Sequence, residues 1–205
     1  MKRLLLSQGR TGSLNLTRFI RESNKNELIV YREPFNTTAI KDTNISFSLE
    51  EIIKTKNSFV ENKIGKGSLP EQLQSKSYDQ IISYFKKNFD IIAFLSRRNF
   101  DAQFKSVITA KISGNWDSPY YYKEFDVKLF SDVEEQLISE RKIINHLSEI
   151  HKIPIFYYED LYDNNKVFYL KDFCRYYYLQ YKEEISFEYM NPNKRYCMND
   201  SKKIL

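Results

Sequence analysis

The sequence predicts a three-layer α/β/α fold around a central, mainly parallel sheet of five strands. Short apolar runs of strand length alternate along the chain with longer amphipathic segments, which is the pattern of repeated strand–helix units. The run 90–96 is apolar almost throughout, as a central parallel strand covered on both faces should be. At 205 residues the chain has room for one sizeable core, so we expect a single domain over residues 1–205.

Five segments are expected to form the strands. Each is a short apolar run that ends at polar residues or at a turn signal. They are residues 4–6, 27–32, 58–64, 90–96 and 153–158. Pro34 stops the second strand, and Gly65-Lys66-Gly67 follows the third. The strands place the core within residues 4–161, and a C-terminal helix and tail occupy residues 162–205.

The segments between the strands carry apolar residues at helical spacing. In the clearest case Tyr78, Ile81, Ile82, Phe85 and Phe89 recur at i, i+3, i+4, i+7 and i+11. Further helices are expected around residues 16–20, from Ser48 as a capping residue, over 100–112, around 130–147 and around 167–181. Strands that alternate with helices in this way favour parallel pairing, because each crossover helix returns the chain to the same end of the sheet.

Charge and composition exclude several classes of protein. Lysine and arginine number 32 against 27 acidic residues, a net charge of +5, which suits an anionic ligand. The lysines are interleaved with acids, which argues against a nucleic-acid partner. No apolar run approaches the ~20 residues of a membrane span. Two cysteines without metal-like spacing are typical of a reduced protein, so we expect a cytoplasmic location and no metal site.

The first strand is followed by a turn, Ser7-Gln8-Gly9-Arg10-Thr11-Gly12-Ser13, that holds two of only five glycines. Ligands of parallel sheets bind at the carboxyl ends of the strands. Gly9 and Gly12 would let the backbone approach an anion, the next helix would offer free N–H groups, and Arg10 and Ser13 would add donors. The spacing and lysine of a Walker A loop are absent. The turn predicts another kind of phosphate cradle, with a plain tight turn as the alternative.

Two further polar segments follow later strands. Arg97 and Arg98 come after the central strand, and Ser106 lies two helical turns further on. An arginine and a serine so placed can grip one phosphate from two sides. Strand alternation sends the two arginines to opposite faces, so either could face the site. Tyr158-Glu159-Asp160-Leu161 follows the last strand, and its two acids are expected to cap a turn.

In this order and at these separations, the segments resemble the sulfotransferases that use 3′-phosphoadenosine 5′-phosphosulfate (PAPS). Arg10-Thr11-Gly12-Ser13 matches the [K/R]-[S/T]-G-[S/T] loop after the first strand of that family. Arg98 and Ser106 match its Arg-x₇-Ser element, and the Tyr-Glu-Asp-Leu segment is another common feature. The likeness covers residues 4–161. The chain is short for the family, and we interpret Asn193-Lys194-Arg195 as a solvated basic tail, with a remnant of the family's C-terminal element that closes over the nucleotide as the alternative.

The branch of the family is suggested by two details. Arg10 stands where the small-molecule branch has lysine, and Glu33-Pro34-Phe35 follows the second strand, where the carbohydrate and tyrosylprotein branches place a catalytic glutamate. The resemblance therefore implies a fold like that of the P-loop nucleotide kinases, with PAPS as co-substrate and no metal ion. It also implies a small-molecule or glycan acceptor, with a carbohydrate hydroxyl favoured over an amine.

The same resemblance implies a role for each site residue. Arg10 would stabilise the leaving group, and Glu33 would take the proton of the acceptor as general base. Arg98 and Ser106 would hold the 3′-phosphate. The residues that would bind PAPS are Gly9, Arg10, Thr11, Gly12, Ser13, Arg98 and Ser106.

Several alternatives stay open at this point. Glu33 could be an ordinary surface carboxylate, and Tyr120-Tyr121-Tyr122 could be core and rim residues or line an acceptor site. A nucleotide or nucleoside kinase of related fold is the second interpretation, although it lacks a Walker lysine. A non-catalytic module that binds nucleic acid is the third, and a sulfotransferase homologue without activity is a fourth.

Overall fold

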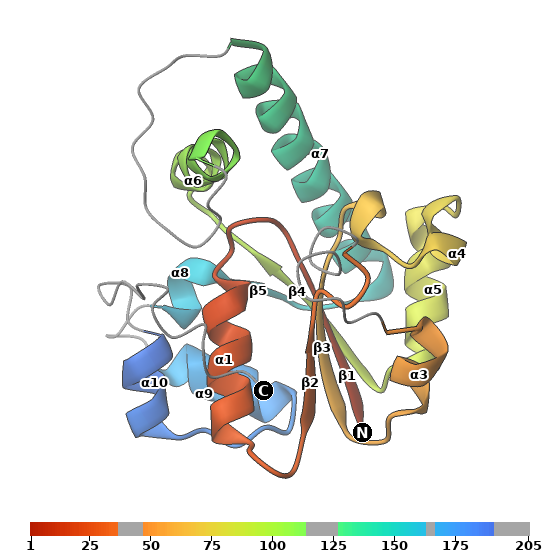
Figure 1. Cartoon of the computed structure of the whole chain (residues 1–205), viewed down its shortest axis with the longest axis vertical. Coiled ribbons are helices and arrows are strands. Elements are labelled where there is room, and N and C mark those ends of the chain that lie inside the picture. Colours follow the sequence, from red (N-terminus) through yellow and green to blue (C-terminus); the bar gives the residue numbers. More distant parts are fainter. Residues whose placement is uncertain (37–46, 114–126, 163–166, 191–205) are drawn as a thin grey trace.

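The computed structural model describes residues 1–36, 47–113, 127–162 and 167–190, in which helices cover both faces of one sheet (Figure 1). The sheet order is β2-β3-β1-β4-β5, and all pairs are parallel. The strands are β1 (Lys2–Ser7), β2 (Ile29–Arg32), β3 (Ser58–Lys63), β4 (Ile91–Ser96) and β5 (Ile155–Tyr157). The predicted three-layer α/β/α fold with a parallel five-stranded sheet is confirmed.

The strand register brings the segments that follow β1, β2 and β3 to one edge of the sheet. Ser7, the last residue of β1, pairs with Lys63 of β3 and with Leu95 of β4. On the other side of β3, Arg32 of β2 pairs with Glu61. Because β1 lies between β3 and β4, the turn after β1 has neighbours on both sides.

One face of the sheet is covered by α3 (Leu49–Lys54), α4 (Glu71–Gln74), α5 (Tyr78–Asn88) and part of α7 (Val127–His151) (Figure 1). Leu4 and Leu6 of β1 point into this core, as strand alternation requires. The helices contribute buried residues that include Ile52, Leu73, Ile81, Ile82, Phe85, Ile144 and Leu147.

The other face is covered by α1 (Ser13–Ser23), α8 (Tyr158–Leu161), α9 (Val167–Tyr176) and α10 (Glu183–Tyr189). Leu5 of β1 and Phe59 of β3 face this layer. Their partners include Leu16, Phe19, Ile20, Leu161, Leu170, Phe173 and Tyr177. This core also contains several buried aromatic rings, among them Phe19, Phe59, Phe173 and Tyr177, which account for part of the high tyrosine and phenylalanine content.

Two elements lie at the carboxyl edge of the sheet. The 3₁₀ turn η1 (Lys66–Ser68) follows β3, and α6 (Phe100–Ser113) follows β4. Val107 and Ile108 of α6 pack against Val133 and Leu137 of α7 in a small separate core. Figure 1 shows α6 beyond the carboxyl end of β4, so α6 can reach the turn after β1.

The last predicted helix, around residues 167–181, is wrong in its extent. Helix α9 ends at Tyr176 and α10 begins at Glu183. Tyr178 has a left-handed φ of 52°, which turns the chain. The side chain of Arg3 donates from Nε to the carbonyl of Tyr177 at 2.5 Å and from Nη2 to that of Tyr178 at 3.3 Å. This distant donor satisfies the carbonyl groups at the helix end.

Within the described ranges, no helix is long and apolar enough to cross a membrane. The predictions for Tyr120-Tyr121-Tyr122 and for Asn193-Lys194-Arg195 fall outside these ranges.

Candidate functional site

The turn between β1 and α1 is shaped by Gly12. This residue precedes α1 with φ 76° and, within the described part of the chain, no side chain caps the helix start. A Cβ at this position would lie 2.7 Å from Cε2 of Tyr162 and 2.8 Å from Cδ2 of Tyr158. Burial raises the pKa of Tyr162 well above its usual value, so its hydroxyl stays protonated and donates to the carbonyl of Gly12. Glycine is therefore required here, and the N–H groups of α1 remain available to an anion.

Two other residues of the turn have distinct surroundings. The hydroxyl of Thr11 is buried and donates to the carbonyl of Gln8 at 3.0 Å, so Thr11 braces the turn from inside. A Cβ at Gly9 would meet nothing within 4 Å, so Gly9 borders open space. The carbonyl of Gly9 accepts a hydrogen bond from Nε2 of Gln103 in α6 at 2.8 Å.

Arg10 and Ser106 are brought together by the fold, although 96 positions separate them. Nε of Arg10 donates to Oγ of Ser106 at 2.7 Å. Helix α6 therefore supports the turn at Ser106 as well as at Gln103. The two predicted ligand-binding residues share one place beside the β1–α1 turn.

Arg98 lies in a different arrangement from the predicted one. Its guanidinium makes a bidentate pair with Asp160, at 2.7 and 2.6 Å, and its side chain is 51% exposed. The hydrogen bond to Asp160 raises the pKa of Arg98. Glu159 accepts from the backbone N–H groups of Arg98 and Asn99, at 2.9 and 3.0 Å. To grip a phosphate together with Ser106, Arg98 would have to leave Asp160.

Arg97 is the arginine of this pair that lies against the glycine turn. Its Nη1 donates to the carbonyl of Arg10 at 3.3 Å, and its side chain is 18% exposed. The guanidinium stacks 4.5 Å from the ring centre of Tyr158, with Nε 3.8 Å from a carboxylate oxygen of Glu159. Arg97 thus lies at the turn while Arg98 lies outside it.

Glu33 follows β2 directly and points toward the same turn. Its carboxylate accepts from Nδ2 of Asn36 at 2.6 Å and lies 3.3 Å from Nζ of Lys63 and 3.7 Å from Arg32. Burial alone raises the pKa of Glu33, but Lys63, the bond from Asn36 and Arg32 together outweigh burial, so that the pKa is lowered. With 11% of its side chain exposed, Glu33 is not a solvated surface carboxylate. It is ionised at neutral pH.

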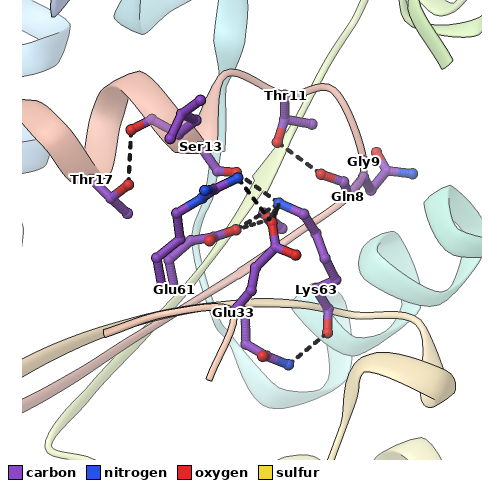
Figure 2. A network of polar contacts seen from close by, with 12 residues as sticks. Gln8, Gly9, Thr11, Ser13, Thr17, Glu33, Glu61 and Lys63 are labelled. Atoms are coloured by element: carbon purple, nitrogen blue, oxygen red, sulfur yellow. Dashed lines mark hydrogen bonds and ion pairs between the residues drawn. The ribbon is translucent and has the colours of Figure 1, made fainter. Parts of the chain in front are cut away.

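Lys63, which the sequence reasoning missed, connects Glu33 to the turn (Figure 2). Its Nζ donates to Oγ of Ser13 at 2.7 Å, to Oγ of Ser7 at 2.9 Å and to Oε1 of Glu61 at 2.7 Å. The ammonium group therefore lies beside the first residue of α1. A signal was available, because Lys63 ends a strand, but its relevance depends on β3 being the neighbour of β1.

A hollow of about 480 Å³ opens elsewhere, where Phe89, Asp90, Lys152 and Tyr176 come together. None of the predicted site residues lines it. In the described part of the chain, no three side chains of His, Cys, Asp or Glu are grouped as a metal site would need. The chemistry of the candidate site thus comes from arginine, lysine, glutamate and hydroxyl groups at the carboxyl edge.

These groups surround the turn with complementary functions. Arg10 and the start of α1 offer positive charge and donors for an anion, and Lys63 adds positive charge beside them, while Glu33 offers an ionised carboxylate that can accept a proton. Searches against protein-family models and curated proteins find no match for the chain.

Proposed function

We propose that the chain is a sulfotransferase that moves the sulfuryl group of PAPS to a hydroxyl or amine of an acceptor, with a carbohydrate hydroxyl favoured. One observation carries the proposal. The β1–α1 turn contacts Ser106 through Arg10 and reaches Glu33 through Ser13 and Lys63. A cradle for an anionic donor and a carboxylate that can accept a proton thus meet at one place. The motif resemblance selects PAPS as that donor.

In the proposed reaction an acceptor oxygen attacks sulfur in line with the phosphate oxygen. The new sulfur–oxygen bond forms while the bond from sulfur to that phosphate oxygen breaks, and its electron pair leaves with 3′-phosphoadenosine 5′-phosphate (PAP). The acceptor's proton passes to the carboxylate of Glu33. Arg10 and the N–H groups of the turn stabilise the charge that grows on the leaving oxygen.

The 3′-phosphate is assigned to Arg98 and Ser106. Arg98 is exposed and paired with Asp160, so binding would exchange one anionic partner for another. A bidentate arginine suits a phosphate as well as a carboxylate. Arg97 lies closer to the turn and supports its backbone by donating to Arg10.

The proposal also includes a cytoplasmic location, no metal requirement and no nucleic-acid partner. The location is supported by Cys174, a buried thiol that is free among the residues that the structure describes, as suits a reducing compartment.

A nucleotide kinase remains the second candidate, and one observation favours it. Lys63 brings an ammonium group to Ser13 at the start of α1, although it comes from β3 and not from the turn. A lysine at this position could contact a transferred phosphoryl group as the Walker lysine does. The two candidates differ in whether the nucleotide carries a 3′-phosphate.

The test of the proposed function is incubation with ³⁵S-labelled PAPS and three acceptor classes, namely sugars, lipids and tyrosine peptides. We expect label on a saccharide. Glu33→Gln should lower the rate by about 10²–10⁴-fold, the usual contribution of a general base. If no acceptor class became labelled and the protein instead transferred a phosphoryl group from labelled ATP, the kinase would be favoured.

A further inference from the structure

Glu61 is a charged residue in the middle of the sheet, and neither the sequence resemblance nor the proposed reaction uses it. It belongs to β3, its exposed fraction is 0%, and its backbone pairs with Leu5 of β1. Oε1 accepts from Oγ of Ser7 at 2.5 Å and from Nζ of Lys63 at 2.7 Å. Oε2 is buried and accepts no hydrogen bond from the described residues.

Such an arrangement is costly for stability alone. Removing a carboxylate from water costs several kcal/mol, and a buried ion pair often contributes no more than apolar residues of the same size would. Here only one oxygen of Glu61 is compensated. The position of the pair, with its cation at the rim of the candidate site, points to a role in that site.

The ammonium group of Lys63 lies closer to the carboxylate of Glu61 than to that of Glu33. Its ammonium group has three protons, and its closest acceptors are Ser13, Glu61 and Ser7, at 2.7, 2.7 and 2.9 Å. Glu33 is further away, at 3.3 Å. Figure 2 shows the two carboxylates converging on the same Nζ atom. Lys63 is therefore held chiefly by Glu61 and the two serines, and only in part by Glu33.

We propose that Glu61 is a positioning residue that holds the Lys63 ammonium group away from full contact with Glu33, so that Glu33 is a stronger base than it would be if Lys63 paired with it fully. This inference rests on the proposed function, in which Glu33 accepts the proton. If Glu61 lost its charge, Lys63 would pair more fully with Glu33. Glu33 would then bind a proton less readily and would accept one from the acceptor more slowly.

The other groups around the pair come from several elements. Arg32 of β2 and Asn36 face Glu33 directly. Glu140 of α7 is buried, bonds to Gln136 and acts on Lys63 through space. Burial raises the pKa of Glu140. Glu140 therefore provides a matched control, as a second buried glutamate that makes no hydrogen bond to Lys63.

The primary test is an NMR titration of the side-chain carboxyl carbon of Glu33 in the free protein, assigned with Glu33→Gln. It needs neither donor nor acceptor. In Glu61→Gln the midpoint of the Glu33 titration should lie below that of the wild type, because Lys63 then pairs more fully with Glu33. Glu140→Gln should lower the midpoint less. An unchanged midpoint in Glu61→Gln, or an equal shift in both variants, overturns the inference.

Kinetics supply the second readout. In Glu61→Gln the acidic limb of the pH profile of kcat/KM should move to lower pH, and kcat should fall roughly tenfold, part of the contribution of a general base. Affinity for PAP should not fall, because Lys63 keeps its positive charge beside the turn, whereas general structural damage would lower it. If Glu61→Gln does not fold, Glu61→Asp is the replacement test. The shorter side chain moves the carboxylate away from Lys63 by one methylene group, so this variant must also lower the midpoint of the Glu33 titration.

The two proposals fail in different ways. An unchanged Glu33 midpoint in a variant that still transfers sulfuryl groups overturns the role of Glu61 alone. If the Glu33 midpoint falls in Glu61→Gln but the wild-type protein transfers no sulfuryl group, the proposed sulfotransferase activity is overturned. The electrostatic link between Glu61 and Glu33 then still stands.

Discussion

Three residues of the candidate site have left-handed backbone angles: Arg10 at φ 60°, Gly12 at φ 76° and Glu33 at φ 45°. Residues other than glycine adopt this conformation uncommonly and at a cost in free energy. Two of the three are the residues to which the resemblance assigns catalysis. At the scale of single residues, backbone strain and proposed chemistry therefore fall in the same place.

The first prediction concerns Gly12. In Gly12→Ala the new methyl group would overlap the rings of Tyr158 and Tyr162. The backbone of the alanine would also have to keep the left-handed φ of Gly12. The free energy of unfolding should fall by roughly 2 kcal/mol or more, measured by denaturant titration. Gly9→Ala is the matched control, because nothing lies within 4 Å of its Cβ, and it should change stability by less than about 0.5 kcal/mol. Equal stability of the two variants would contradict this account of the turn.

The second prediction is a pH dependence. Lys63, Asn36 and Arg32 together lower the pKa of Glu33 in the folded protein. A carboxyl group with a lowered folded pKa stabilises the fold above its unfolded pKa, and this contribution is lost as pH falls through the folded value. Glu33→Gln should therefore be less stable than the wild type at neutral pH, and the two unfolding free energies should converge in acid. A difference in unfolding free energy that widens toward low pH would contradict a lowered pKa of Glu33 in the folded protein.

Sequence patterns could find Arg10, Gly12 and Ser106, whereas the only sequence signal for Lys63 is its place at the end of a strand, and Glu61 has none. The first three lie in motifs with a defined spacing. Lys63 and Glu61 lie in a strand with no such motif, and their importance depends on β3 being the neighbour of β1. Contacts between strands far apart in sequence are not encoded in local spacing.

At the scale of elements, two helices begin with reciprocal caps. Ser48 and Glu51 form a capping box at α3, and Ser77 and Gln80 form one at α5. At each helix the serine hydroxyl accepts a hydrogen bond from the backbone N–H of the residue three positions later. The side chain of that later residue accepts a hydrogen bond from the backbone N–H of the serine. The predicted helix start at Ser48 is confirmed, because capping chemistry is local.

The third prediction tests one of these caps. Ser77→Ala removes the acceptor for the backbone N–H of Gln80 and should cost about 1 kcal/mol of stability, measured by chemical denaturation. Ser75 is exposed near the same helix, and Ser75→Ala should be close to neutral. A neutral Ser77→Ala would mean that packing alone determines where α5 begins.

The fourth prediction concerns the connection from β4 to α6. If Arg98 reads the 3′-phosphate, Arg98→Ala should weaken PAP binding by about 1.5–3 kcal/mol, the range for a charged hydrogen bond, and affect ADP little. Asp160→Asn frees Arg98 from its present partner and should leave PAP binding at least as strong. Comparable losses for PAP and ADP in Arg98→Ala would show that Arg98 does not read the 3′-phosphate.

The end of α9 shows why element boundaries were harder to predict. Apolar spacing continues through Tyr181 and predicts a longer helix than the structure has. The structure ends it at Tyr176, where Arg3 from β1 satisfies the carbonyl groups that follow. This donor is more than 170 positions away in the sequence, so local periodicity contains no sign of it.

At the scale of the whole molecule, the order of the strands creates the site. The alternating pattern predicts a parallel sheet, but it does not say which strands are neighbours. The observed order puts β1 between β3 and β4. The turn after β1 therefore receives Lys63 from one side and the β4–α6 segment from the other. Several short motifs, each unspecific alone, meet there.

The central claim is that this turn binds a nucleotide with a 3′-phosphate. Calorimetric titration of the wild-type protein with PAP and, separately, with ADP tests it most directly. We expect PAP to bind at least tenfold more tightly than ADP, which corresponds to about 1.4 kcal/mol and to one well-placed contact with the extra phosphate. Equal affinities, or no binding of PAP, would contradict the proposed function.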